Sequence, residues 1–189
     1  MSAANTASII RAFGTLIWNP TDLGAAEPYG GTYLGQVRGI VFKPQPQYRD
    51  IWAEEFGSVT DSIYVGEGPC EIRATLRYPD VDMVNVVAPK SIQPGSSGIH
   101  WLFRPGGTTS NTRAGTSLYD SKSGKLLFAP YATNAHPMIL MYKALPQIAT
   151  DGEIPFSIKD EWGLPVRFVG APDSNGRVYD TGRKATLVL

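Results

Sequence analysis

The residues in this chain that could perform acid–base or metal chemistry are few and lie far apart. The two histidines, His100 and His136, fall in different segments, and neither has a second histidine or a carboxylate at a metal-ligand spacing such as H-E-x-x-H. The carboxylate pairs Glu54-Glu55 and Asp160-Glu161 are adjacent in sequence. Neighbouring side chains of a strand point to opposite faces, so Glu54 and Glu55 cannot flank one bond, as a glycosidase would require. These residues predict no catalytic pair.

Glycine-rich and serine-rich stretches give no clearer chemical signal. Gly95-Ser96-Ser97-Gly98 lacks the G-x-S-x-G arrangement that presents a nucleophilic serine. Gly66-Glu67-Gly68 lies between two predicted strands, whereas a phosphate-binding loop needs a helix after it, so this segment predicts a hairpin turn at positive φ. Arg104 and Arg113 lie in a Gly/Ser/Thr-rich stretch and could contact a phosphate or an acidic neighbour. The plainer interpretation is a solvated loop that contacts protein. The sequence thus predicts a non-enzyme with no cofactor or metal.

Composition favours one globular domain in a reducing compartment. The chain has 189 residues, and its 17 Lys and Arg balance its 17 Asp and Glu, so it lacks the basic excess typical of nucleic-acid binding. The single cysteine, Cys70, excludes an internal disulfide and a zinc framework; we expect it to be a small buried hydrophobe. No signal-peptide pattern and no apolar run of about 20 residues is present, which predicts an unexported protein that does not span a membrane.

The strongest structural signal is the alternation from Cys70 to Tyr78. Every second residue is apolar or aromatic, and the polar residues between them are Glu71, Arg73, Thr75 and Arg77. Because successive strand side chains point to opposite faces, this run predicts a sheet with one buried face and one wet, charged face. We expect it to form a hairpin with the preceding run, Val59–Val65, through residues 66–69. Pro79 and the N-cap residue Asp80 then predict a short helix, ended by Pro89, whose valines dock on a sheet.

Short strand-like runs separated by glycine and proline fill the rest of the chain. The predicted fold is mainly β, a sandwich or barrel of about ten strands with one short α-helix packed on the outside. We expect a flexible N-terminal arm at residues 1–8 and a single β domain at 9–189, with a long loop at 104–124 that is either functional or mobile. Met138–Ala144 is apolar enough to be a central strand. Ala185–Leu189 is expected to be a last strand pinned in the sheet.

Several segments in order resemble the major tail tube proteins of long-tailed bacteriophages. The resemblance begins with the opening strand and its following turn, and continues through the alternating strand with its helix. Its later part runs from Gly115 to Pro146. The segments that carry it include Phe13–Trp18, Gly30–Gly35, Ala53–Gly57, Asp61–Glu67, Leu126–Pro130, Met141–Pro146 and Val166–Asp173. None of these segments contains a catalytic motif.

The resemblance implies a virion structural protein that assembles with copies of itself. Members of this family form six-membered rings that stack into a hollow tube, each subunit lending strands to an inner barrel, with genome DNA passing down the lumen without specific binding. It also implies contact with other phage tail proteins, assembly in the bacterial cytoplasm and a final location in the virion tail. Candidate inter-subunit or lumen-facing residues are Glu71, Arg73, Thr75, Arg77, Arg104 and Arg113. Arg73 and Arg77 outnumber Glu71, so this face is more basic than expected for a lumen through which DNA must pass without binding. Alternatively, these arginines face a neighbouring sheet.

Two other classes of protein share these features. Another virion component, such as a tail terminator, a baseplate ring or a capsid decoration protein, would have a similar composition. A carbohydrate-binding β-sandwich is supported only by the tryptophans Trp18, Trp52, Trp101 and Trp162. One or two of them could stack on a sugar ring, although core or interface positions are commoner for tryptophan.

Overall fold

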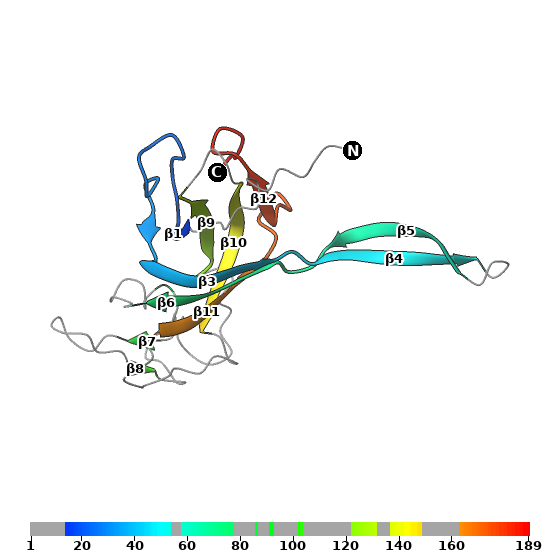
Figure 1. Cartoon of the computed structure of the whole chain (residues 1–189), viewed down its shortest axis with the longest axis horizontal. Helices are drawn as coiled ribbons and strands as arrows, with labels where there is room; N and C mark the ends of the chain where they lie inside the picture. Colours follow the sequence, from blue (N-terminus) through cyan, green and yellow to red (C-terminus); the bar gives the residue numbers. More distant parts are fainter. Residues whose placement is uncertain are drawn as a thin grey trace, which may run out of the picture.

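The computed structural model describes residues 14–53, 58–77, 86, 91–92, 102–103, 122–131, 137–148 and 163–189. The strands in these ranges are β1 (Gly14–Trp18), β2 (Thr32–Tyr33), β3 (Gln36–Lys43), β4 (Pro46–Ala53), β5 (Ser58–Glu67), β6 (Glu71–Arg77), β7 (Ser91–Ile92), β8 (Leu102–Phe103), β9 (Gly124–Pro130), β10 (Met138–Ile148), β11 (Gly163–Gly170) and β12 (Tyr179–Gly182). An eight-stranded antiparallel sheet has the order β2-β1-β9-β10-β11-β6-β3, with β12 also paired to β10 (Figure 1). The pairs β4-β5 and β7-β8 form two separate small sheets.

The mainly β prediction is confirmed, and Met138–Ala144 does lie in a central strand, since β10 pairs with β9, β11 and β12. The predicted N-terminal arm and most of the 104–124 loop lie outside the described residues. Of the predicted helix only Val86 is described, and it is helical.

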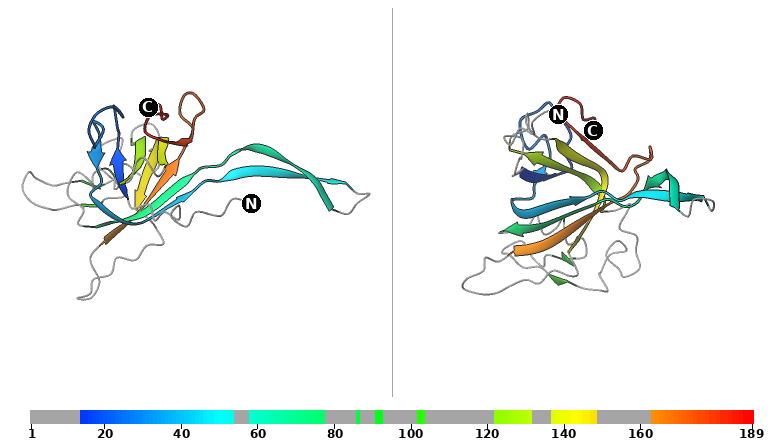
Figure 2. Two further views of the ribbon diagram at one scale, coloured as in Figure 1. Left: turned by 45° about the horizontal axis from the view of Figure 1, so that its top comes forward. Right: turned by 45° about the vertical axis from the view of Figure 1, so that its right-hand side comes forward.

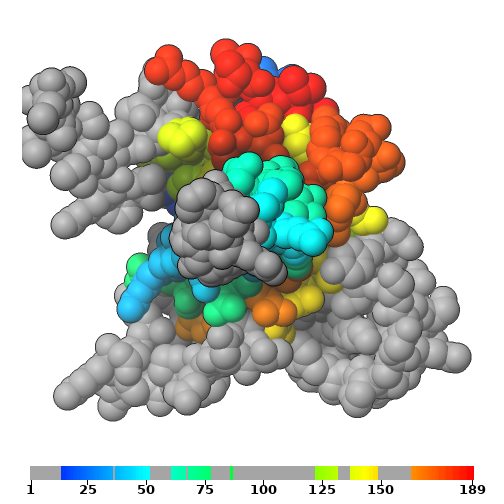
Figure 3. All heavy atoms as spheres, turned by 90° about the vertical axis from the view of Figure 1, so that its right-hand side faces the viewer, coloured from blue at the N-terminus to red at the C-terminus, as the bar shows by residue number. Residues whose placement is uncertain are grey.

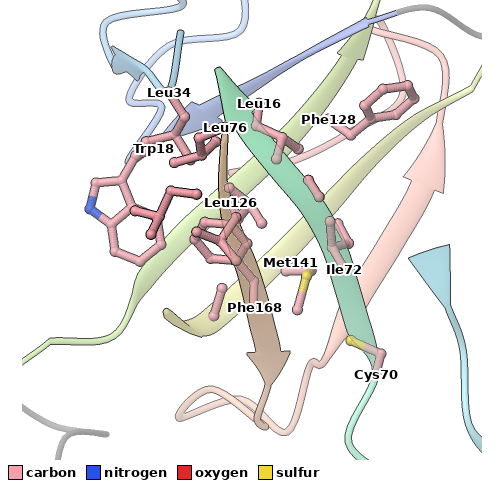
Figure 4. Close-up of a cluster of buried hydrophobic side chains, with 14 residues drawn as sticks. Leu16, Trp18, Leu34, Cys70, Ile72, Leu76, Leu126, Phe128, Met141 and Phe168 are labelled. Atoms are coloured by element: carbon pink, nitrogen blue, oxygen red, sulfur yellow. The ribbon is translucent and has the colours of Figure 1, made fainter. Parts of the chain in front are cut away.

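The large sheet curls around one apolar core. The side chains of Ile72, Ala74 and Leu76 on β6, and of Cys70 just before it, are buried, so the alternation read from the sequence correctly identifies the inner face. The other strands turn their own alternate residues inward to meet them, as Figure 4 shows; this cluster includes Leu16, Trp18, Leu126, Phe128, Met141, Val166 and Phe168. The backbone N–H of Leu34 donates to the Leu16 carbonyl at 2.9 Å, which brings the start of β3 close to β1 and helps the sheet curl (Figure 2).

A second apolar cluster covers the opposite face of β1, β9 and β10. Ile17, Leu127 and Leu140 are each 0% exposed on this side. They pack under Leu23 and Tyr29 of the loop before β2, with Leu187 near the C-terminus. Because both faces of these strands are buried, their sequences are nearly continuously apolar instead of alternating. These strands are therefore the centre of the body.

The predicted hairpin between Val59–Val65 and Cys70–Tyr78 is wrong. The first run is β5, which pairs with β4, and the second is β6, which pairs with β3 and β11. Residues 36–77 instead make one long hairpin that turns between β4 and β5, so Gly66-Glu67-Gly68 lies where one sheet passes into the next, not at a turn. Pro44 and Pro69 stand near this passage and have no N–H to donate, which interrupts the ladder without reversing the chain.

The predicted C-terminal strand is also wrong. Residues 184–186 form a turn and 187–189 have no strand structure. The end of the chain is held by burial of Leu187 and by the Tyr142 hydroxyl, which donates to the Val188 carbonyl at 3.1 Å. Burial and the nearby Asp180 charge raise the pKa of Tyr142 above its ordinary value of about 10, which extends to higher pH the range in which its hydroxyl can donate.

Asp173-Ser174-Asn175-Gly176 is a sequence typical of a tight turn, and it does form a turn, which the Asp173 carboxylate closes. Its Oδ1 accepts from the backbone N–H groups of Asn175 and Arg177 at 2.9 and 2.8 Å, and the Arg177 guanidinium donates to Oδ2 at 2.9 Å. Arg177 also lies over the Tyr142 ring, 3.9 Å from its centroid. The turn is thereby tied to β10.

We expect Asp173 to make the fold sensitive to acid. Partial burial opposes its ionisation, but the hydrogen bonds from Arg177 and Asn175 outweigh it and hold the pKa of Asp173 below its usual range. A lowered folded-state pKa stabilises the protein above the unfolded-state pKa of about 3.9, and this stability is lost as the pH falls through the folded-state value. Asp173→Asn should lower the Tm at pH 7 and reduce the fall in Tm between pH 5 and pH 3. Equal Tm loss in both proteins over that range would contradict this role.

We also expect the Cys70 thiol to be inert in the native protein, because it is 0% exposed inside the core. A thiol reagent should modify it at least about a hundredfold faster in denaturant, where the local structure that protects it is lost. Rapid labelling of the folded protein would show that β6 opens.

Candidate functional site

The four candidate residues on β6 lie together on its outward side. Arg73, Thr75 and Arg77 are half-buried there, while Glu71 is only 8% exposed, so the expectation of a fully wet charged face is wrong at this position. The Glu71 carboxylate forms an ion pair with the Arg73 side chain, which offsets part of the cost of its burial. The remaining two candidates, Arg104 and Arg113, lie outside the described residues.

Strand pairing extends this side of β6 into a larger charged surface. Arg167 of β11 stands directly opposite Arg73, and on the other flank Arg38 and Lys43 of β3 stand opposite Thr75 and Glu71. Arg38 and Lys43 are exposed, and Arg167 is half-buried with two hydrogen bonds to the Gln147 side chain. We call this surface the basic face; its charged residues among the described strands are Arg38, Lys43, Glu71, Arg73, Arg77 and Arg167, with a net formal charge of +4.

The basic face as a whole was not predicted from the sequence. The alternation of β11 places Arg167 on the side opposite Leu164, Val166 and Phe168, which a reading of that run could have shown. Its position beside Arg73 depends on β11 pairing with β6, about 90 residues away in sequence, and no local pattern encodes that pairing.

A second surface is the two-stranded sheet of β4 and β5, which projects away from the body (Figures 1 and 2). We call residues 46–67 the ribbon. Among the described strands, β4 and β5 pair only with each other. Figure 3 looks at the ribbon from its far end and shows it standing in front of the body. At about 3.3 Å per residue, the ten residues of β5 span about 33 Å.

The ribbon exposes large apolar side chains that the body does not cover. Tyr48, Ile51, Ile63, Tyr64 and Val65 are between 39% and 62% exposed. They account for five of the nine exposed large hydrophobic residues in the described part of the chain, and none of them belongs to either core cluster. A two-stranded sheet is only marginally stable in water, and a patch of exposed apolar side chains is typical of a protein contact site.

The register of the ribbon separates its two faces. Tyr48 lies opposite Tyr64 on one face, with ring centroids 5.9 Å apart in an edge-to-face arrangement. On the same face the Ser62 hydroxyl donates to the Asp50 carboxylate at 2.9 Å. The other face carries the opposed pairs Arg49 with Ile63 and Ile51 with Asp61. Both faces thus combine apolar contact area with charge.

The residues first considered for chemistry are not brought together among the described residues. His100, His136, Glu54-Glu55 and Asp160-Glu161 lie outside the described residues, as do Trp101 and Trp162. Trp18 is 8% exposed and packs against Phe168, with 6.0 Å between ring centroids, so it is a core residue and not a sugar platform. In the described ranges there is no cluster of three or more metal-binding side chains and no helix long and apolar enough to span a membrane.

Two hollows are present on the described surface. One, of about 440 Å³, lies between Tyr64 of the ribbon and residues 172–181. The other, of about 330 Å³, lies beside Asn19, Lys125 and Lys143. The first contains Asp180 and two tyrosines, and the second contains lysines and Tyr142.

Comparison with protein-family models and with curated protein sequences finds no match for this chain.

We expect the body to fold without the ribbon. The Gly68 N–H donates to the Gln45 carbonyl at 2.7 Å, so the two chain ends already lie close together where the ribbon leaves the body. Replacing residues 46–67 by Asn-Gly, a two-residue hairpin turn, should leave a cooperatively unfolding protein with a Tm within about 5 °C of the full chain. Circular dichroism melting would measure this. Loss of cooperative unfolding would show that the ribbon supports the core.

Proposed function

We propose that this chain is a virion structural protein, a subunit of a bacteriophage tail tube that assembles with its own copies into stacked six-membered rings through which genome DNA passes. The observation that carries the proposal is the ribbon, a projecting sheet whose exposed apolar side chains and edge strands are suited to contact with another protein. The resemblance in sequence to tail tube proteins supplies the class of assembly.

Self-assembly would give the edge strands of each copy a further partner strand. Both strands of the ribbon, and β3 and β2 at the ends of the large sheet, are edges among the described strands. An exposed apolar edge strand tends to pair with other chains, and a closed ring satisfies such edges with copies of the same subunit. The finer fold proposed is the tail-tube type of sandwich or barrel, with the short helix at 80–88 packed outside.

The basic face bears on which surface lines the tube. Each contact between a cation and a phosphate strengthens binding to DNA, and a bore that attracts DNA would hinder its passage. With a net formal charge of +4, the basic face is therefore better suited to contact with a neighbouring subunit than to the lumen.

The proposal predicts that the purified protein forms hollow tubes at high concentration, visible by negative-stain electron microscopy. The protein lacking residues 46–67 should remain in small particles under the same conditions, because it lacks the projecting contact surface. Single unstacked rings would favour a tail terminator or a baseplate ring. A full-length protein that stays monomeric at every concentration tested would overturn the proposal.

A further inference from the structure

We propose that the basic face of one copy is the docking site for the ribbon of the next copy, in a head-to-tail contact driven by opposite charge. This inference rests on the proposed function, because it names the partner surface through which the subunits assemble.

The ribbon is the acidic counterpart of the basic face. Residues 46–67 contain one cation, Arg49, and five acidic residues, giving a net formal charge of −4; the acidic residues are Asp50, Glu54, Glu55, Asp61 and Glu67. The chain as a whole is neutral, so the remainder carries +4, equal and opposite to the ribbon. The ribbon sequence is therefore acidic and the rest of the chain is basic; Glu54 and Glu55 of the ribbon lie outside the described residues.

The basic face places like charges side by side. Arg73 and Arg167 stand directly opposite each other on β6 and β11. Like charges at opposed positions of a sheet destabilise it. The ion pair with Glu71 offsets part of the charge of Arg73, and an approaching acidic surface relieves the repulsion that remains. Exposed Val41, 47% accessible between Arg38 and Lys43, adds an apolar contact point that suits the isoleucines, valine and tyrosines of the ribbon.

The ribbon of a subunit does not lie over the basic face of the same subunit. The ribbon is a continuation of β3 and β6, the strands that carry most of the basic face, and it extends away from them along the strand direction (Figures 1 and 2). A projection of about 30 Å reaches past the edge of its own body. Two different surfaces that bind each other between identical copies make a heterologous contact, which closes into a ring or continues as a helix.

A nucleic acid is a poorer occupant of the basic face than the ribbon. The chain lacks the overall basic excess of nucleic-acid-binding proteins. The same hairpin that carries Arg38, Lys43 and Arg73 also carries the acidic ribbon, which would repel a polyanion lying along it.

Charge reversal on each surface tests the contact. The ribbon variant is Asp50→Lys, Asp61→Lys and Glu67→Lys, and the face variant is Arg38→Glu, Lys43→Glu and Arg167→Glu. Each alone should raise the concentration needed for assembly at least about tenfold, because like charges now meet at the contact. The two variants mixed in equal amounts should assemble together, as should a protein carrying all six changes, since opposite charges meet again. Wild-type assembly should also weaken as salt shortens the Debye length from about 30 Å at 0.01 M to about 3 Å at 1 M.

A matched control reverses three cations outside both surfaces, Lys122→Glu, Lys125→Glu and Arg183→Glu, and should assemble as the wild type does. Analytical ultracentrifugation and electron microscopy measure assembly, and protection of the Cys70 thiol confirms that each variant is folded.

The outcomes separate this inference from the proposed function. If the wild type forms tubes but the two variants assemble as well as it does, or if neither mixing nor the six changes together restore assembly, the docking contact is wrong and the tube function stands. If the two variants bind each other while the wild type forms neither rings nor tubes, the contact stands and the tube function is wrong. Binding of a short DNA duplex to the wild type, lost in the face variant without any change in assembly, would replace the ribbon by nucleic acid as the occupant.

Discussion

The long hairpin of residues 36–77 determines the shape of this protein, because its two strand pairs, β3-β6 and β4-β5, follow one another along the same two chain segments. The part of the hairpin within the body, β3 and β6, forms one end of the curled sheet, and its residues Ile72, Ala74 and Leu76 are buried in the core. Its other part, β4 and β5, continues in the same two chain directions beyond the body, where its large apolar side chains stay exposed. One element therefore belongs both to the hydrophobic core and to the outer surface.

This division explains why the body and the ribbon obey different rules of composition. In the body, apolar residues alternate where one face is buried, as in β6, and run together where both faces are buried, as in β9. In the ribbon, tyrosine, isoleucine and valine alternate with Asp and Arg on both faces, and neither face is buried. The first pattern stabilises the body, whereas the second pattern suits the contact between copies that we propose. The separation of charge follows the same boundary.

The sequence predicted local features well and long-range pairing poorly. The alternation from Cys70 to Arg77 identified the buried side chains, because the two-residue period of a strand is a local property. The Asp173–Gly176 turn was also recognisable, since its hydrogen bonds join near neighbours. The partner strands of β6 were not predicted, because the sequence Gly-Glu-Gly-Pro at residues 66–69 suits a connection between two sheets as well as it suits a hairpin turn. Leu187 and Leu189 suggested a strand, but burial of a single leucine and one side-chain hydrogen bond hold that end instead. Of the charged surface, Arg73 and Arg77 were predicted, and their neighbours from β3 and β11 were not.

The passage between the body and the ribbon has a mechanical consequence. There the two sheets meet at the hydrogen bond from Gly68 to Gln45, and prolines at positions 44, 46 and 69 thin the ladder around it. A segment with fewer cross-strand bonds bends at lower force than the sheets on either side. In an assembly built from such subunits, bending would occur at these connections while each core kept its packing. A long filament would then bend without losing contacts between its subunits.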